Sequence, residues 1–269
     1  MIRNKTSYPL VMIVAAAGLG RRMGTAFATT PKPIIQDPVT SRPLLHHMMD
    51  RVSRAGNLDE VVIVGRREAG AGKRVAQCAK NRQADKQPAV RLCLPQLRGP
   101  THALMIGLQC GFRKTEAHYL LTMGDTLAER YPSFEGLDYD VLIGVNARLQ
   151  TQWKKFTPLW EVGGDAIFTA TPQARVWGIR GVYLLRSHAA QSVLTLLRQE
   201  WRKYKQGCPL EFRERWDRNG EMHLSWVWPE VVKQGMRIGV TDLGEVAEVN
   251  TPEDLVDLGR LVAGESLLE

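Results

Sequence analysis

The 269-residue chain is poor in cysteine and contains no long apolar run. None of its four cysteines belongs to a CxxC pair, which argues against a disulfide framework and against a structural zinc site. No stretch approaches the roughly 18 apolar residues that a membrane-spanning helix needs. We therefore expect a cytoplasmic protein with reduced thiols and no membrane span. A signal peptide stays open as an alternative, because Arg3 and Lys5 precede the apolar run 10–17.

Low-complexity tracts, internal repeats and linker-like segments are also missing, so we expect one domain over residues 1–269 with an irregular subregion at about 146–235. A content of 44% hydrophobic and 24% charged residues excludes an intrinsically disordered or fibrous chain. The net charge of +8 suits an anionic partner such as a phosphorylated metabolite, a nucleotide, a nucleic acid or a membrane surface.

Strand-like and helix-like segments alternate about every 30 residues, which predicts an α/β protein with a Rossmann-like, mixed and mostly parallel sheet flanked by helices. The expected strands are 10–17, 60–65, 90–94, 118–123, 140–145, 179–185, 237–241 and 245–249, with short antiparallel strands in 146–178. The expected helices are 43–56, 69–84, 101–112, 187–206 and one that ends at 230–235. A C-terminal helix should have Thr251 as its N-cap and Pro252 at its first position.

A glycine-rich turn, AAAGLGRRMG, follows the first expected strand. Small residues let its backbone N–H groups approach and cradle a phosphate. Met23 stands where a dinucleotide fingerprint needs Gly or Ala, and no P-loop string is present. Lys32 follows between two prolines and adds a fixed cation that suits a triphosphate. The alternative is an ordinary strand-to-helix turn with solvated arginines. The nucleotide-binding candidates are Ala16, Ala17, Gly18, Leu19, Gly20, Arg21 and Arg22.

This string, followed by PKP, resembles the N-terminal signature of nucleotidyltransferases of the nucleotide-diphospho-sugar transferase fold. That family includes sugar-1-phosphate nucleotidyltransferases and the molybdenum-cofactor nucleotidyltransferases. The resemblance implies the family's fold, an NTP substrate and Mg²⁺, with Arg22 and Lys32 as catalytic cations. Arg21 stands where the family usually has a small or hydroxyl residue.

Asp125 directly follows the expected strand 118–123 and its Gly124. It should lie at the carboxyl edge of the sheet, where parallel sheets bind ligands, and a carboxylate there suits Mg²⁺. The resemblance implies that Asp125 is catalytic and holds the metal, and that Asn250, just before TPEDL, is the second metal ligand. The alternatives are structural: Asp125 as a turn residue and Asn250 as a helix cap.

Three residues of the loop that precedes the expected helix 101–112 are candidates for contacting the nucleotide, namely Gln96, Gly99 and Thr101. The resemblance implies that such a loop reads the base. It also implies that Gly181 lies beside the acceptor, together with Lys32, although Gly181 is alternatively a bulge glycine.

Two strings mix basic and aromatic residues, at 153–156 and 201–205. Either can line an acceptor phosphate pocket, form a dimer contact or touch RNA. For the second, a solvated helix face is the favoured interpretation.

Together these patterns predict a Mg²⁺-dependent nucleotidyltransferase. It would join the NMP part of an NTP, with CTP or UTP favoured, to a phosphorylated or phosphonate small-molecule acceptor and release pyrophosphate. The region 146–235 would set the acceptor. No nucleic-acid partner is expected, and a homodimer stays open. The alternatives are a non-catalytic nucleotide sensor and a glycosyltransferase of the same fold, although the DxD motif of the latter is absent after Asp125.

Overall fold

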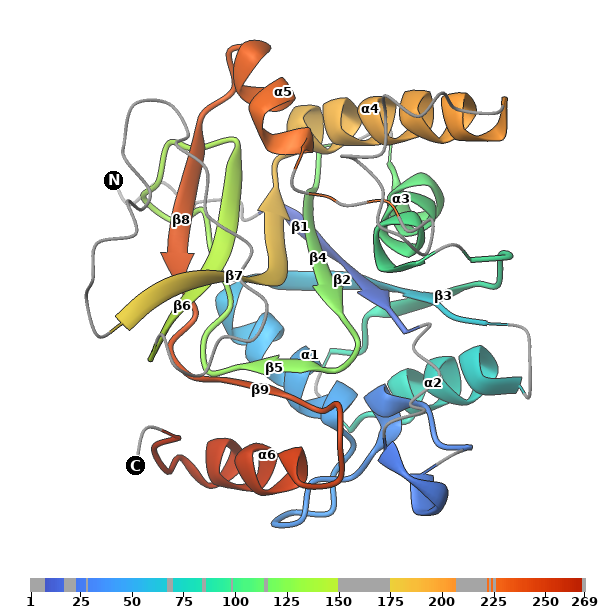
Figure 1. Ribbon diagram of the computed structural model, residues 1–269, viewed down its shortest axis with the longest axis vertical. Coiled ribbons are helices and arrows are strands. Elements are labelled where there is room, and N and C mark those ends of the chain that lie inside the picture. Colours follow the sequence, from blue (N-terminus) through green and yellow to red (C-terminus); the bar gives the residue numbers. More distant parts are fainter. Residues whose placement is uncertain are drawn as a thin grey trace.

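The computed structural model describes residues 8–16, 23–27, 29–66, 70–83, 86–97, 99–113, 116–149, 175–206, 222, 224 and 226–267. Within these ranges the chain forms a seven-stranded sheet with helices on both faces and a separate pair of short strands (Figure 1). The expected mixed, mostly parallel α/β architecture is confirmed. No helix in the described part of the chain is long and apolar enough to cross a membrane.

The elements follow the expected order closely. The strands are β1 (Pro9–Ala15), β2 (Asn57–Val64), β3 (Ala89–Cys93), β4 (His118–Met123), β5 (Thr126–Ala128), β6 (Val141–Leu149), β7 (Arg175–Leu185), β8 (Ile238–Asp242) and β9 (Val246–Glu248). The helices are α1 (Leu44–Ala55), α2 (Ala71–Lys80), α3 (Gly99–Gly111), α4 (Ser187–Lys205), α5 (Val227–Lys233) and α6 (Asp254–Ala263), with short 3₁₀ turns at η2 (Thr25–Phe27) and η3 (Lys32–Ile34). The short strand β5 was not expected from the sequence.

The large sheet has the strand order β3-β2-β1-β4-β7-β6-β8. Among the described strands of this sheet, β7 alone runs antiparallel to its neighbours. The chain moves outward from β1 through β2 to β3, and then returns through α3 to β4 on the other side of β1. The winding direction therefore reverses between β1 and β4. In open α/β sheets, such a reversal marks the crevice where ligands bind.

The described core side chains form two clusters, one on each face of the sheet. Along β1, Val11 and Ile13 pack on the face of α3, α4 and α5, whereas Met12 and Val14 pack on the face of α1 and α2. All four are fully buried. A strand that is covered on both faces needs apolar residues at every position, which explains the continuous apolar run.

The small sheet lies between the large sheet and α6 (Figure 1). In it β5 pairs antiparallel with β9, so that Thr126 lies opposite Glu248 and Leu127 opposite Ala247. Arg51 of α1 connects β5 with α6. Its guanidinium donates to the carbonyl oxygen of Ala128 in β5 at 2.6 Å and to that of Leu261 in α6 at 3.0 Å.

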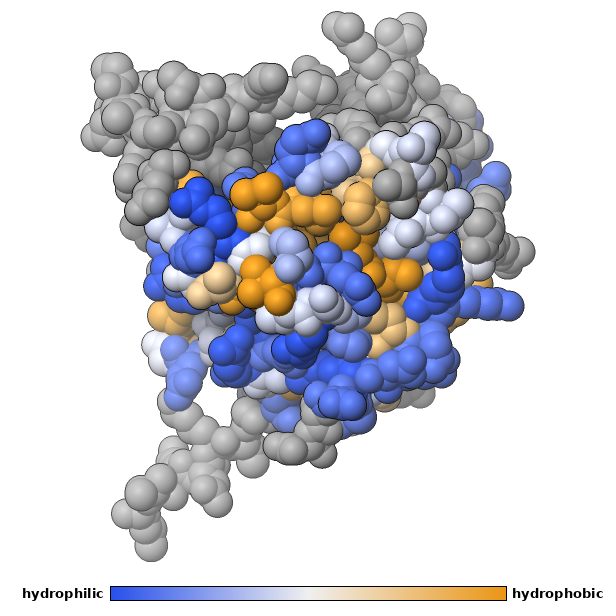
Figure 2. All heavy atoms as spheres, turned by 90° about the horizontal axis from the view of Figure 1, so that it is seen from below, coloured by the Kyte–Doolittle hydropathy of each residue, from blue (hydrophilic) through white to orange (hydrophobic). Residues whose placement is uncertain are grey.

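The outer face of this layer is mostly polar. Figure 2, which views the molecule from below Figure 1, shows hydrophilic residues around a smaller apolar area. Val39 and Val256 are exposed apolar side chains, and the Pro38–Val39 turn packs close to Gly259 of α6. Gly259 lets this turn approach, because a Cβ there would lie 2.8 Å from Cγ of Pro38.

We predict that Arg51→Met lowers the free energy of unfolding by about 2 kcal/mol, because two carbonyl oxygens lose charged donors. Arg54→Met is the matched control, since Arg54 is an exposed arginine on the same helix. Urea unfolding of both variants measures the difference. Equal stability losses for the two variants would contradict the structural role given to Arg51.

We also predict that the stability falls as the pH drops from about 6.5 toward 4. Burial, with a further contribution from the nearby Arg186 charge, lowers the pKa of His118 to about 4. The unfolded chain therefore binds a proton in this window that the folded chain does not, so acid favours unfolding. His118→Gln should flatten this part of the profile of unfolding free energy against pH. An unchanged slope in the variant would refute the assignment.

Candidate active site

The site begins where β1 and β4 end side by side. Ala15 is the register partner of Met123, and the carbonyl oxygen of Ala15 accepts the N–H of Gly124 at 3.0 Å. A Cβ at Gly124 would lie 2.7 Å from Cγ of Pro33 and 3.1 Å from that same carbonyl oxygen. Only glycine fits this contact without displacing its neighbours. The turn before Asp125 is thereby pressed against the Pro31–Pro33 segment.

The small sheet brings the C-terminal part of the chain to the same place. Asp125 directly precedes β5, and Val249 directly follows β9, the partner of β5. The carbonyl oxygen of Asp125 accepts the N–H of Val249 at 2.8 Å, which continues the pairing by one step. Asn250 is thus held beside Asp125.

Lys32 completes the arrangement. It starts the 3₁₀ turn η3 after Pro31, and its side chain is only 10% exposed, whereas that of Asp125 is 29% exposed. Its ammonium nitrogen Nζ donates to Oδ2 of Asp125 at 2.8 Å and to Oδ1 of Asn250, also at 2.8 Å. Along the chain, Lys32 is 93 positions from Asp125 and 218 positions from Asn250. These three residues were proposed from separate motifs, and they meet in one hydrogen-bonded group.

The start of α6 positions Asn250 in a way that sequence reasoning missed. The carboxylate of Asp254 accepts the backbone N–H groups of Asn250 and Thr251, both at 2.7 Å. A carboxylate three residues after Thr251 is the spacing of a capping box, so a signal for this contact was present in TPED. Asp254 thereby fixes the backbone on which the Asn250 amide stands.

The expected helix start was wrong by two residues. Thr251 was expected as the N-cap and Pro252 at the first helical position, but α6 begins at Asp254 with Glu253 as its N-cap. Residues 251–256 instead form successive i to i+3 turns. Glu253 accepts its own backbone N–H and the Thr251 hydroxyl, and these bonds hold the pKa of Glu253 below its usual range.

The candidates for nucleotide contact near α3 lie at the carboxyl end of β3, on the same edge of the sheet as Asp125. Gln96 is exposed in the loop, and Thr101 is buried in the first turn of α3. Gly99 has a φ of +82°, a conformation that favours glycine. The Gln96 side chain is thus exposed, as it must be in order to contact a ligand.

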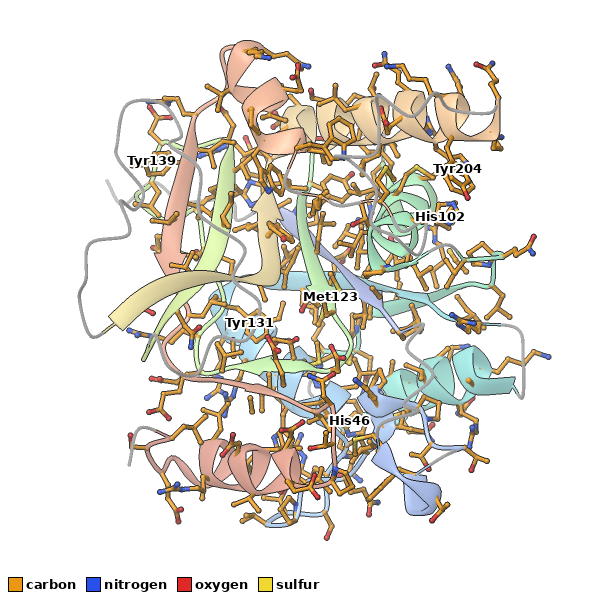
Figure 3. All side chains as sticks on the ribbon, in the orientation of Figure 1. His46, His102, Met123, Tyr131, Tyr139 and Tyr204 are labelled. Carbon is orange, nitrogen blue, oxygen red and sulfur yellow. The ribbon has the colours of Figure 1, made fainter. Side chains whose placement is uncertain are left out.

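Gly181 is a bulge glycine that also lies beside the site. The register of β6 against β7 shifts between Ile143 and Val145, and Gly181 has a φ of +66° at that irregularity. A Cβ there would lie 3.0 Å from the side chain of Met123, which Figure 3 labels near the centre of the molecule. The structure thus supports the bulge interpretation, and a place beside the acceptor stays a prediction.

Part of the glycine-rich turn lies outside the described residues, namely Ala17, Gly18, Leu19, Gly20, Arg21 and Arg22, and so does the string 153–156. On either side of that turn, Ala16 donates its N–H to the carbonyl oxygen of Val64 at 2.9 Å, and Met23 is fully buried in the core. Met23 therefore anchors the end of the turn by packing.

The second basic and aromatic string lies on α4. Trp201 stacks on the ring of the buried His102 with centroids 4.0 Å apart, and Tyr204 stacks on Trp201 at 5.4 Å. Figure 3 shows His102 and Tyr204 near each other between α3 and α4. Lys203 and Lys205 are exposed. The aromatic residues therefore pack α4 against α3, and the basic residues form the solvated face of α4.

Among the described residues, no group of three or more His, Cys, Asp or Glu side chains is placed to hold a metal ion. The donors at the site are instead one carboxylate, Asp125, and one amide, Asn250. Both are oxygen donors, the type that Mg²⁺ prefers, and Mg²⁺ commonly takes one or two protein ligands together with substrate phosphates. The donor set therefore fits Mg²⁺ bound jointly with a phosphorylated substrate.

Comparison with known proteins points in the same direction. Residues 12–128, which span β1 to β5, match the family described as MobA-like NTP transferase domain. This part of the chain is similar to the nucleotidyltransferase family. This match contains Lys32 and Asp125, whereas Asn250 lies beyond it.

The curated relatives cover only parts of the chain. The bifunctional protein GlmU of Sorangium cellulosum is 33% identical over 109 residues, which are 36% of this chain and 22% of that protein. The CMP-5'-(3-aminopropyl)phosphonate synthase of Streptomyces rubellomurinus is 40% identical over 57 residues, which are 21% of this chain and 9% of that protein. The chain thus matches less than a quarter of the length of either relative.

Solved structures agree over almost the whole chain. A UDP-glucose pyrophosphorylase crystallised with UDP-glucose superposes with a TM-score of 0.66 at 14% identity, and covers 96% of this chain and 99% of its own. At this identity the likeness shows a shared fold, and that fold includes the C-terminal part that supplies Asn250.

We predict that Asp254→Ala lowers the free energy of unfolding by about 1 kcal/mol, because two backbone N–H groups lose their acceptor. Asp257→Ala is the matched control, since Asp257 is an exposed carboxylate in the same first helical turn. Chemical denaturation measures both variants. A loss of the same size in the control would mean that only charge near the helix start matters.

Proposed function

We propose that this chain is a Mg²⁺-dependent nucleotidyltransferase that joins the NMP part of an NTP to a phosphorylated or phosphonate small molecule and releases pyrophosphate. The observation that carries the proposal is the meeting of Lys32, Asp125 and Asn250 at the carboxyl edge of the sheet. A cation and two oxygen donors at this edge suit a metal-bound triphosphate better than any neutral ligand. The match of residues 12–128 to the MobA-like NTP transferase domain supports the same reaction class.

In this proposal Asp125 and Asn250 hold Mg²⁺. When bound, the metal supplies positive charge that offsets the charge of the phosphate oxygens. The backbone of the turn 18–24 and the Arg22 side chain bind the β- and γ-phosphates. Lys32 then neutralises negative charge that develops at the α-phosphoryl group and on the acceptor.

No general base is assigned. A phosphate or phosphonate oxygen of the acceptor is already a nucleophile, so it attacks the α-phosphorus in line while the bond to pyrophosphate breaks. The chain contributes positioning and electrostatic stabilisation. In this proposal Gly181, beside the end of β4, lets the acceptor approach the backbone of β7, and Lys32 also contacts the acceptor.

For the nucleotide we propose CTP or UTP, read by the loop that contains Gln96, Gly99 and Thr101. The name of the Streptomyces relative contains a CMP group and a phosphonate, which supports a pyrimidine nucleotide and an acceptor of this chemical class. The irregular region 146–235 of the single domain would select the acceptor.

The test is pyrophosphate release from each of ATP, GTP, CTP and UTP with Mg²⁺ and a panel of sugar phosphates, polyol phosphates, amino-alcohol phosphates and phosphonates. We expect one pyrimidine triphosphate to be used with one acceptor, and EDTA to abolish the release. Nucleotide binding without release for any acceptor would favour the sensor. Sugar transfer from a nucleotide sugar would favour the glycosyltransferase.

We predict that Asp125→Ala lowers kcat by on the order of 10²–10³, because the only proposed carboxylate ligand is lost. Asp138→Ala is the control, since Asp138 is an exposed carboxylate that pairs with Arg237 near the start of β8. Turnover is measured with the active pair of substrates found above. Near-normal turnover in Asp125→Ala would show that the metal assignment is wrong.

A further inference from the structure

The two oxygen atoms assigned to the metal are already used by one ammonium group. Oδ2 of Asp125 and Oδ1 of Asn250 each lie 2.8 Å from the same nitrogen, Nζ of Lys32. Asp125 carries one negative charge, Asn250 is neutral and Lys32 carries one positive charge. The charges at the group therefore balance without a metal ion.

A metal ion and the Lys32 ammonium cannot share these oxygens in the observed arrangement. Mg²⁺ binds its ligands at about 2.0–2.1 Å, so a cation that takes both oxygens would lie within contact range of Nζ. Two like charges at such a distance repel strongly in a partly buried site. A metal ion that takes both of these oxygens therefore requires Lys32 to leave them.

Lys32 has little freedom to leave on its own. Its backbone is held by Pro31 and Pro33, by the 3₁₀ turn that begins at Lys32, and by the contact of Pro33 with the Gly124 turn. Its side chain is 90% covered. Only the flexible side chain can move, and a largely buried ammonium needs another anionic partner to move to.

A triphosphate supplies that partner. It carries roughly four negative charges and would bind at the same edge of the sheet, so its oxygens can accept the ammonium hydrogen bonds. Once Lys32 turns toward the phosphates, Asp125 and Asn250 become available to a metal.

We infer that Lys32 occupies the metal position in the nucleotide-free protein, and that nucleotide binding opens this position by drawing Lys32 away. The inference rests on the proposed function for the identity of the nucleotide site. It goes beyond that function by specifying an order: free metal binds weakly, and metal enters together with, or after, the triphosphate. Because linkage is reciprocal, the metal strengthens nucleotide binding by the same factor.

The experiment measures Mn²⁺ binding without any nucleotide, by calorimetry and by the electron paramagnetic resonance signal of the free ion. Wild-type protein is compared with Lys32→Met and Lys32→Gln. We expect Mn²⁺ to bind both variants about tenfold more tightly or better, because the competing charge is gone. Lys205→Met is the matched control, since Lys205 is an exposed lysine at the end of α4, and it should bind Mn²⁺ as the wild type does.

Two further measurements locate the effect. The double variant Lys32→Met with Asp125→Ala should lose the gain in affinity. Mn²⁺ should raise the Tm of Lys32→Met but leave that of the wild type nearly unchanged, which also reports whether the variant is folded. Lys32→Gln keeps a polar side chain and serves if Lys32→Met does not fold.

Unchanged or weaker Mn²⁺ affinity in the folded Lys32 variants would overturn the inference. So would a gain that survives the loss of Asp125. These results are independent of turnover: a protein that releases no pyrophosphate would defeat the proposed function, and the Mn²⁺ measurements would still decide the competition between Lys32 and metal.

Discussion

The parallel pairing of β1 with β4 is the interaction on which the rest of the molecule depends. β1 lies at the point where the winding of the chain reverses, and its side chains are buried on both faces of the sheet. The matched ends of the two strands place Ala16, which follows β1, next to the Gly124–Asp125 turn. The contact of Pro33 with Gly124 lies at that edge, and the neighbouring Lys32 bonds Asp125 there.

Much of this arrangement could be predicted from the sequence, for local reasons. The expected strand 118–123 has the same bounds as β4, since its apolar run ends sharply at Gly124–Asp125. The edge rule for parallel sheets then predicts that Asp125 lies at the edge where β1 ends, as the pairing of β1 with β4 shows. Helix α1 also agrees, because Leu44, Leu45, Met48 and Met49 repeat with helical spacing and all are buried.

The remaining features depend on contacts between distant parts of the chain. Nothing local in Lys32 indicates that its ammonium bridges Asp125 and Asn250, because that contact requires the pairing of β5 with β9. β5 has three residues, too few for a periodic pattern to be visible. The start of α6 was misplaced because the Asp254 carboxylate organises the preceding turn through backbone N–H groups.

The pairing of β5 with β9 also has a consequence for how the protein is made. The segment that matches the family ends at residue 128, with the last residue of β5, and it holds Lys32 and Asp125. Its partner strand begins at Val246, so that more than a hundred further residues leave the ribosome before β9 and Asn250 are available. During synthesis the sheet around β1 can therefore pack early, while the group at its edge is among the last parts of the fold to close.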